Sequence, residues 1–154
     1  MYNAVDVLMR VALATEGASE VPANTNRGPF VERCQRITGN KAGDPWCASW
    51  LAMVGTAAVG ESWPLPKTGG CQALADFAKA KGVLKDTPQD GDAFLVWHES
   101  LHRFGHTGLV LDATTRDTIS GNTSGAGSRE GWIVGRRIWT FTPADRFIRW
   151  TALL

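Results

Sequence analysis

The fold is decided by residues 44–50, Asp-Pro-Trp-Cys-Ala-Ser-Trp, which predict the start of a central helix. Asp44 is suited to cap that helix, and Pro45 fits its first position, where no backbone N–H is needed. Apolar residues recur at helical spacing from there to residue 59, and Gly60 is a typical helix stop. We therefore expect a helix over residues 45–59 at the centre of the protein.

Cys47 falls in the first turn of this predicted helix. Free backbone N–H groups and the helix dipole favour an anion there, so a thiolate would have a lowered pKa and would be the stronger nucleophile at neutral pH. The alternative is a small apolar core residue, because cysteines outside disulfides are among the most buried residue types. The rest of the chain has to decide between a nucleophile and a core residue.

The composition is that of one globular domain over residues 1–154. The apolar fraction is 44%, and 16 basic against 15 acidic residues give a net charge of +1, which argues against electrostatic capture of nucleic acid or of an anionic membrane. No apolar run reaches the roughly 18 residues of a membrane span. Residues 1–13 carry Asp6 and Arg10 inside an apolar pattern, so we expect no signal peptide and synthesis in the cytoplasm.

The chain has three cysteines, Cys34, Cys47 and Cys71. An odd number without a tight spacing pattern favours a reduced chain. Cys34 belongs to the apolar stripe of a predicted helix and is expected in the core. A bridge between Cys34 and Cys71 stays open.

Hydrophobic periodicity divides the chain into a helical first half and a stranded second half. Helices are expected over about residues 4–16, 29–38, 45–59 and 71–81. Strands are expected at residues 93–97, 107–111, 118–122, 132–134, 138–141 and 147–150. Helices followed by consecutive strands predict an α+β fold, with about four helices packed on an antiparallel sheet of five or six strands.

His106 is the best candidate for the base that a cysteine nucleophile needs. It stands at the start of a predicted strand, near Gly105 and Gly108, where small residues permit close approach. A strand is a stiff support for a catalytic group. The base needs a neighbour that fixes its orientation, and Asn122 suits that role because it ends the next predicted strand. Side-chain alternation places Ser120 on the same face as Asn122.

These residues lie in short motifs that resemble the CHAP family, whose members are cysteine- and histidine-dependent amidohydrolases and peptidases. The motifs are Trp-Cys-Ala at residues 46–48, Gly-Asp at 91–92, Gly-His-Thr-Gly-Leu-Val at 105–110, Gly-Asn-Thr at 121–123 and Asn-Arg-Gly-Pro-Phe-Val at 26–31. Their order and spacing agree over roughly residues 5–142.

The resemblance implies a papain-like fold, related to the NlpC/P60 domains. It implies Cys47 as nucleophile, His106 as base and Asn122 as the residue that orients the imidazole, with no cofactor or metal. It also implies bacterial peptidoglycan as the substrate. The expected activity is that of an amidase or endopeptidase, which would cut an amide in the peptide part of the cell wall through a thioester on Cys47.

Such an enzyme would be an endolysin or a delivered lytic effector. It would be made in the cytoplasm and would act on the wall after phage lysis, or after delivery by a secretion system or a particle. A delivered toxin would also need an immunity protein as a partner. Otherwise we expect a monomer that binds no nucleic acid and does not insert into membranes.

One position departs from the family pattern. Many members have Glu two residues before this Asn, where this chain has Ser120. A neutral Ser can form a hydrogen bond but cannot support an imidazolium electrostatically, so Ser120 is at most a helper to the triad. The N–H of Cys47 is one expected oxyanion donor, and the second is expected from residues 40–43.

Two alternatives stay open at this point. His98, His102 and His106 are spaced so that they would share one face of a helix and could bind zinc there, although the surrounding residues favour a loop. The other alternative is a non-enzymatic wall-binding or phage-structural module that stacks sugars on tryptophans near predicted loops. Those tryptophans are Trp63, Trp97 and Trp132.

Overall fold

Helices fill the first half of the chain and strands the second in the computed structural model, which describes residues 3–123 and 131–154. The α-helices are α1 (Ala4–Ala14), α2 (Pro29–Thr38), α3 (Cys47–Val59) and α4 (Cys71–Ala80). The strands are β1 (Leu84–Lys85), β2 (Ala93–His98), β3 (Arg103–Asp112), β4 (Asp117–Thr123), β5 (Ile133–Ile138) and β6 (Arg146–Ile148). Short 3-10 helices are η1 (Gly60–Ser62), η2 (Glu99–Leu101) and η3 (Trp150–Leu153).

The strands form one antiparallel sheet in the order β1-β6-β2-β3-β4-β5. Strands β2 to β5 follow one another as a meander, and β6 returns to lie between β1 and β2. The predicted α+β class is therefore confirmed. The prediction of a strand over residues 138–141 is wrong, because β5 ends at Ile138 and the following segment leaves the sheet.

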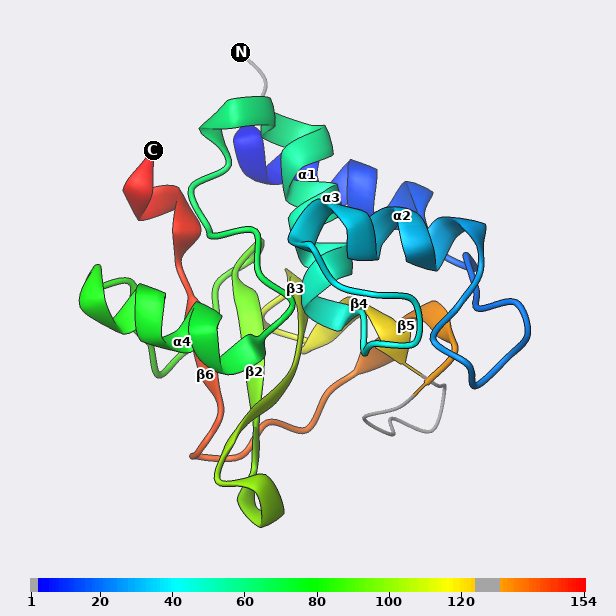
Figure 1. Cartoon of the computed structure of the whole chain (residues 1–154). Coiled ribbons are helices and arrows are strands. Elements are labelled where there is room, and N and C mark those ends of the chain that lie inside the picture. The colour runs from blue at the N-terminus through cyan, green and yellow to red at the C-terminus, as the bar shows by residue number, and fades with distance from the viewer. Residues whose placement is uncertain (1–2, 124–130) are drawn as a thin grey trace.

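Helix α3 occupies the centre of the molecule (Figure 1). It contacts α1 and α2 on one side and strands β3 and β4 on the other, while α4 packs against β1 and β3. Because neighbours surround α3, its first eight residues are all buried except Met53, and its sequence is apolar on every face. The helix therefore owes its stability to the sheet and to the other helices.

Two glycines allow close packing, one between the sheet and α3 and the other between neighbouring strands of the sheet. A Cβ on Gly121 would lie 2.7 Å from Cζ3 of Trp46 and 2.8 Å from Cβ of Trp50, so a side chain at this position would collide with the start of α3. A Cβ on Gly108 would lie 2.5 Å from Cβ of Ser120 on the neighbouring strand. Glycine at both positions brings β3, β4 and the first turn of α3 together.

The start of α3 differs from the prediction. The helix begins at Cys47, and the carboxylate of Asp44 accepts a hydrogen bond from the N–H of Lys41 (2.8 Å) in the preceding loop. Trp46 is the N-cap and makes no side-chain capping bond within the described residues. Asp44 and Pro45 therefore belong to the loop, because the Asp44 carboxylate binds the loop backbone and the helical hydrogen bond from the N–H of Trp50 runs to the carbonyl of Trp46. The predicted end at Gly60 is confirmed.

The other helix ends follow local sequence signals. Asn3 caps α1, with Oδ1 accepting a hydrogen bond from the N–H of Val5 (3.0 Å). Helix α2 begins at Pro29 and ends before Gly39, which has a left-handed φ of 73°. Residues 3–123 and 131–154 contain no helix with both the length and the apolar character needed to cross a bilayer.

Candidate active site

Cys47 is the first residue of α3 and lines a cleft. Its side chain is 4% exposed. The cleft has a volume of about 340 Å³ and is lined by Asn40, Asp44, Pro45, Cys47, Gly69, Cys71, Arg103 and Gly105. Since no side chain caps α3 in the described part of the chain, its first backbone N–H groups are left to interact with the Cys47 sulfur or with a bound anion.

Buried polar side chains hold the loop that leads into α3. Glu20 is 4% exposed, and its carboxylate accepts hydrogen bonds from Nε1 of Trp46 (3.0 Å) and from the N–H of Thr25 (2.7 Å). Nε2 of Gln35 donates to the carbonyl oxygens of Asn26 and Asp44, both at 2.9 Å. Residues far apart in the sequence therefore fix the backbone on both sides of Pro45.

His106 lies on β3 and is almost fully buried, with 1% of the residue exposed. Its Nε2 is 3.1 Å from Oγ of Ser120 on β4. The indole of Trp139 stacks on the imidazole at 5.4 Å with an interplanar angle of 17°, and the ring of Phe94 lies 5.9 Å away. One hydrogen bond and two aromatic rings therefore fix the orientation of the imidazole.

The remaining ring nitrogen of His106 is available to Cys47. Nδ1 is buried and has no hydrogen bond of normal geometry to any described residue. The imidazole is nevertheless close enough to the thiol to lower the pKa of Cys47.

The pKa of Cys47 lies well below the usual range for a cysteine. The largest cause is the contact with the thiol of Cys71, and the His106 imidazole and the N–H of Thr107 act in the same direction. Burial opposes them but does not cancel them. In contrast, burial raises the pKa of Cys34 to about 12. The thiolate that a nucleophile needs is therefore favoured at Cys47. Cys34 is a core residue, as its position in the apolar stripe of α2 predicted.

Cys71 is a part of this site to which the sequence assigned no role. It is the first residue of α4, and its Sγ lies 3.7 Å from Sγ of Cys47. All three cysteines are thiols in the structure, so Cys71 is not bridged to Cys34. The cleft thus holds two neighbouring thiols at the starts of two different helices. Helical periodicity placed Cys71 near a helix start but gave no sign of which residue it would meet.

Ser120 and Asn122 do not occupy equivalent positions on β4. The pairing of β4 with β5 shifts between Ser120 and Thr123, and Asn122 has a left-handed φ of 53°. The regular alternation that we expected is thus interrupted. Asn122 is buried beside the site, but its Oδ1 has no hydrogen-bond partner among the described residues, whereas Ser120 contacts the imidazole directly.

The helical metal site that the histidine spacing suggested is wrong. His98 ends β2, His102 follows η2 with a left-handed φ of 47°, and His106 lies within β3. The three histidines therefore do not share a helix. Among residues 3–123 and 131–154, no three His, Cys, Asp or Glu side chains are grouped so that they could hold a metal ion.

The three tryptophans that were candidates for sugar stacking do not form one surface. Trp63 is 7% exposed and packs against the ring of Trp150 at 5.1 Å, so it belongs to the core. Trp132 is 41% exposed, and Trp97 is half-buried. Trp97 instead lines a second hollow.

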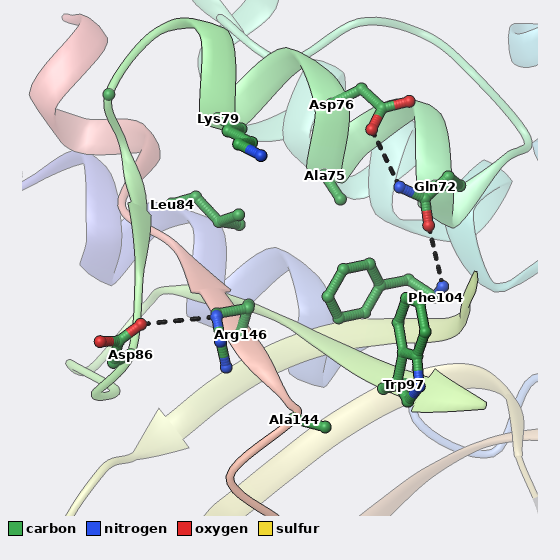
Figure 2. A pocket seen from close by; sticks show the side chains of 11 residues that line it. Gln72, Ala75, Asp76, Lys79, Leu84, Asp86, Trp97, Phe104, Ala144 and Arg146 are labelled. Atoms are coloured by element: carbon green, nitrogen blue, oxygen red, sulfur yellow. Dashed lines mark hydrogen bonds and ion pairs between the residues drawn. The ribbon is translucent and has the colours of Figure 1, made fainter. Parts of the chain in front are cut away.

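This second hollow lies beside the cysteine cleft and has a volume of about 610 Å³. Figure 2 shows its lining, with the rings of Trp97 and Phe104 at one end and charged side chains of α4, β6 and the segment after β1 around it. The two rings meet edge to face at 5.1 Å. The charged residues are Asp76, Lys79, Asp86 and Arg146.

The cleft and the hollow share a wall. Along α4, Cys71 lines the cleft and Gln72 lines the hollow, and along β3, Arg103 and Gly105 line the cleft while Phe104 lines the hollow. Oε1 of Gln72 accepts a hydrogen bond from the N–H of Phe104 (3.1 Å), as Figure 2 shows. The two cavities therefore lie on either side of this α4–β3 contact.

Trp139, like Cys71, is a residue of the site that sequence reasoning missed. It lies just beyond β5, in the segment that was expected to be a strand, and it stacks on His106 from outside the sheet. The apolar residues around Trp139 in the sequence correctly indicated that it is buried, but nothing in the sequence indicated that it would stack on His106. Comparison of the chain with protein-family models, with curated proteins and with solved structures gave no match.

Proposed function

We propose that this protein is a cysteine-dependent hydrolase with a papain-like arrangement, in which Cys47 is the nucleophile and His106 the base. The observation that carries the proposal is the thiol at the uncapped start of α3, with its pKa lowered, next to a buried imidazole. A nucleophile and a base supplied by a helix start and an antiparallel strand are the parts that thiol hydrolysis needs.

The reaction would begin when His106 takes the proton of Cys47. The thiolate attacks the carbonyl carbon of an amide, and the oxygen becomes an oxyanion. His106 then gives the proton to the leaving amine, which leaves a thioester on Cys47. Water, activated by the same imidazole, hydrolyses the thioester and releases the acid.

The oxyanion would be bound at the start of α3. The N–H of Cys47 is one donor, because the first turn of the helix has no side-chain cap. The side-chain amide of Asn40 is the best second donor. Asn40 lines the same cleft, packs against Gly69, and falls in the stretch where a second donor was expected.

Ser120 is the best-placed residue to orient the base. Its hydroxyl can accept the Nε2 proton of His106 at 3.1 Å, which leaves Nδ1 to face the thiol. Asn122, which the family resemblance implies in this role, is the second candidate. A serine adds no negative charge, so the stacked ring of Trp139 provides the remaining support for the orientation of the imidazole.

The proposed substrate is the peptide part of bacterial peptidoglycan, as the CHAP resemblance implies. The second hollow suits the part of such a peptide that lies away from the scissile bond. The hollow offers apolar and aromatic surface together with carboxylates and cations. Peptidoglycan peptides combine short apolar side chains with free amines and carboxylates, which these surfaces can bind. The roles proposed above, as endolysin or as delivered lytic effector, use this same chemistry.

Digestion of purified sacculi tests this proposal most directly. Wild-type protein should release fragments with new amino groups, identified by mass spectrometry, and Cys47→Ala should release none while keeping the same circular dichroism spectrum. His106→Ala should lose activity by about two to four orders of magnitude, because it removes both the proton acceptor and the proton donor. New reducing sugar ends would contradict the proposal. Wild-type protein that binds sacculi without cleaving them, with the same affinity as Cys47→Ala, would favour a wall-binding module.

A further inference from the structure

The cysteine cleft contains one thiol more than the proposed hydrolysis uses. Sγ of Cys71 lies 3.7 Å from Sγ of Cys47, and each residue is 4% exposed at the edge of the same cleft. Each cysteine begins a helix, of 13 residues for α3 and 10 for α4, that no side chain of the described residues caps. Two helix starts therefore meet at one pair of sulfur atoms.

The two sulfur atoms are close to disulfide distance. A disulfide bond is about 2.05 Å long, so the two sulfur atoms would have to approach by about 1.7 Å for the bond to form. Cys34 cannot compete for either partner, because it is fully buried on α2 and its raised pKa, about 12, keeps it protonated.

We propose that Cys47 and Cys71 form a site of reversible oxidation, in which Cys71 is the resolving cysteine that turns an oxidised Cys47 into an intramolecular disulfide. The loss of activity that follows from this rests on the proposed function, because Cys47 is its nucleophile. The oxidation itself does not depend on that function.

Hydrogen peroxide, or another hydroperoxide, is the oxidant that this chemistry requires. The Cys47 thiolate attacks one peroxide oxygen, the O–O bond breaks, and the products are a sulfenic acid on Cys47 and hydroxide, which takes up a proton to give water. The Cys71 sulfur, having lost its proton, attacks the Cys47 sulfur. The S–O bond breaks, and the hydroxide released combines with that proton to give a second water. Two thiols have then lost two electrons to one peroxide.

Reduction reverses the modification. A dithiol attacks the disulfide, becomes a cyclic disulfide itself and returns both cysteines to thiols. Without a resolving thiol, the sulfenic acid of Cys47 would react with a second peroxide to give a sulfinic acid, which a dithiol does not reduce. Cys71 therefore protects Cys47 while it makes the hydrolase inactive.

The test uses the whole chain, treated with one to a few equivalents of hydrogen peroxide near neutral pH and then with N-ethylmaleimide in denaturant. Wild-type protein should lose about 2 Da, take up one maleimide at Cys34, and give a Cys47–Cys71 peptide pair on digestion. Dithiothreitol should restore three maleimide sites. In Cys71→Ser, Cys47 should instead gain about 32 Da as the sulfinic acid and should not be rescued by dithiothreitol.

Cys34→Ala is the matched control and should oxidise as wild type does. The proposal is overturned if Cys71 keeps reacting with maleimide after peroxide, if the bridge contains Cys34, or if Cys47 is over-oxidised equally fast in wild type and in Cys71→Ser while both have the same melting temperature. If the disulfide forms but the reduced protein never cleaves sacculi, the oxidation site stands and the hydrolase proposal fails.

Discussion

The hydrogen bond between Nε2 of His106 and the Ser120 hydroxyl leaves Nδ1 as the ring nitrogen that takes the proton of Cys47 in the proposed mechanism. Ser120→Ala should therefore lower kcat/KM about five- to tenfold, since one hydrogen bond has a net value of about 1 kcal/mol. Initial rates on sacculi or on a muropeptide measure the change. Asn122→Ala should cost less, because its Oδ1 accepts no hydrogen bond from a described residue. A larger loss of kcat/KM in Asn122→Ala than in Ser120→Ala would assign the orienting role to Asn122.

The contact with Cys71 is the main reason why the pKa of Cys47 is low. A thiolate forms as pH rises through the pKa, so a lowered pKa moves the rise in alkylation rate to lower pH. Cys71→Ala should therefore move the iodoacetamide rate profile of Cys47 to higher pH. Cys71→Ser keeps a hydrogen-bond donor and should move it less. An identical profile in wild type and Cys71→Ala would mean that the thiol contact has no influence.

At the level of elements, the packing of the start of α3 depends on Gly121 of β4, which faces Trp46 and Trp50. Gly121→Ala places a methyl group within 3 Å of Trp46 and Trp50, neither of which can move freely in the core. We expect a loss of about 1–3 kcal/mol in the free energy of unfolding, measured by urea denaturation. Gly70→Ala is the control, because its Cβ meets nothing closer than 3.7 Å. Equal stability of the two variants would contradict the packing argument.

The sequence predicted elements whose signals are local and missed features that depend on distant partners. Proline and glycine set the limits of α2, and Gly60 set the end of α3. The start of α3 was wrong by two residues because the Asp44 carboxylate binds the loop backbone and not the helix. Strand β1 was missed because two residues carry no periodicity and form a strand only by pairing with β6.

The same reasoning explains what was found of the site. Cys47 and His106 were proposed as site residues from their positions at the starts of a helix and a strand, together with the family resemblance, and the structure places both beside one another. The Cys47–Cys71 contact and the Trp139–His106 stack join residues that no local pattern connects. Only the folded chain brings them together, because each lies on an element whose partner is set by packing.

At the scale of the whole molecule, the cleft and the hollow form one candidate surface for an extended substrate. Lys79 lines the hollow, whereas Lys81 on the same helix end lies over the ring of Phe77. If the hollow binds the distal part of the substrate, Lys79→Ala should raise KM about threefold to tenfold with little change in kcat, and Lys81→Ala should change neither. A fall in kcat without a change in KM would exclude a binding role for the hollow.

The aromatic cover of the imidazole has a consequence for the biosynthesis of the protein. Cys47 precedes the sheet in the sequence, but the ring that stacks on the proposed base, His106, is that of Trp139, and β6, at Arg146–Ile148, pairs with β2 beside β3. A nascent chain that has left the ribosome only as far as β4 has the proposed nucleophile and base, but lacks both of these supports. We therefore expect ribosome-bound intermediates that lack these two segments to be inert toward amides, so that an active thiol forms only after Trp139 and β6 have left the ribosome.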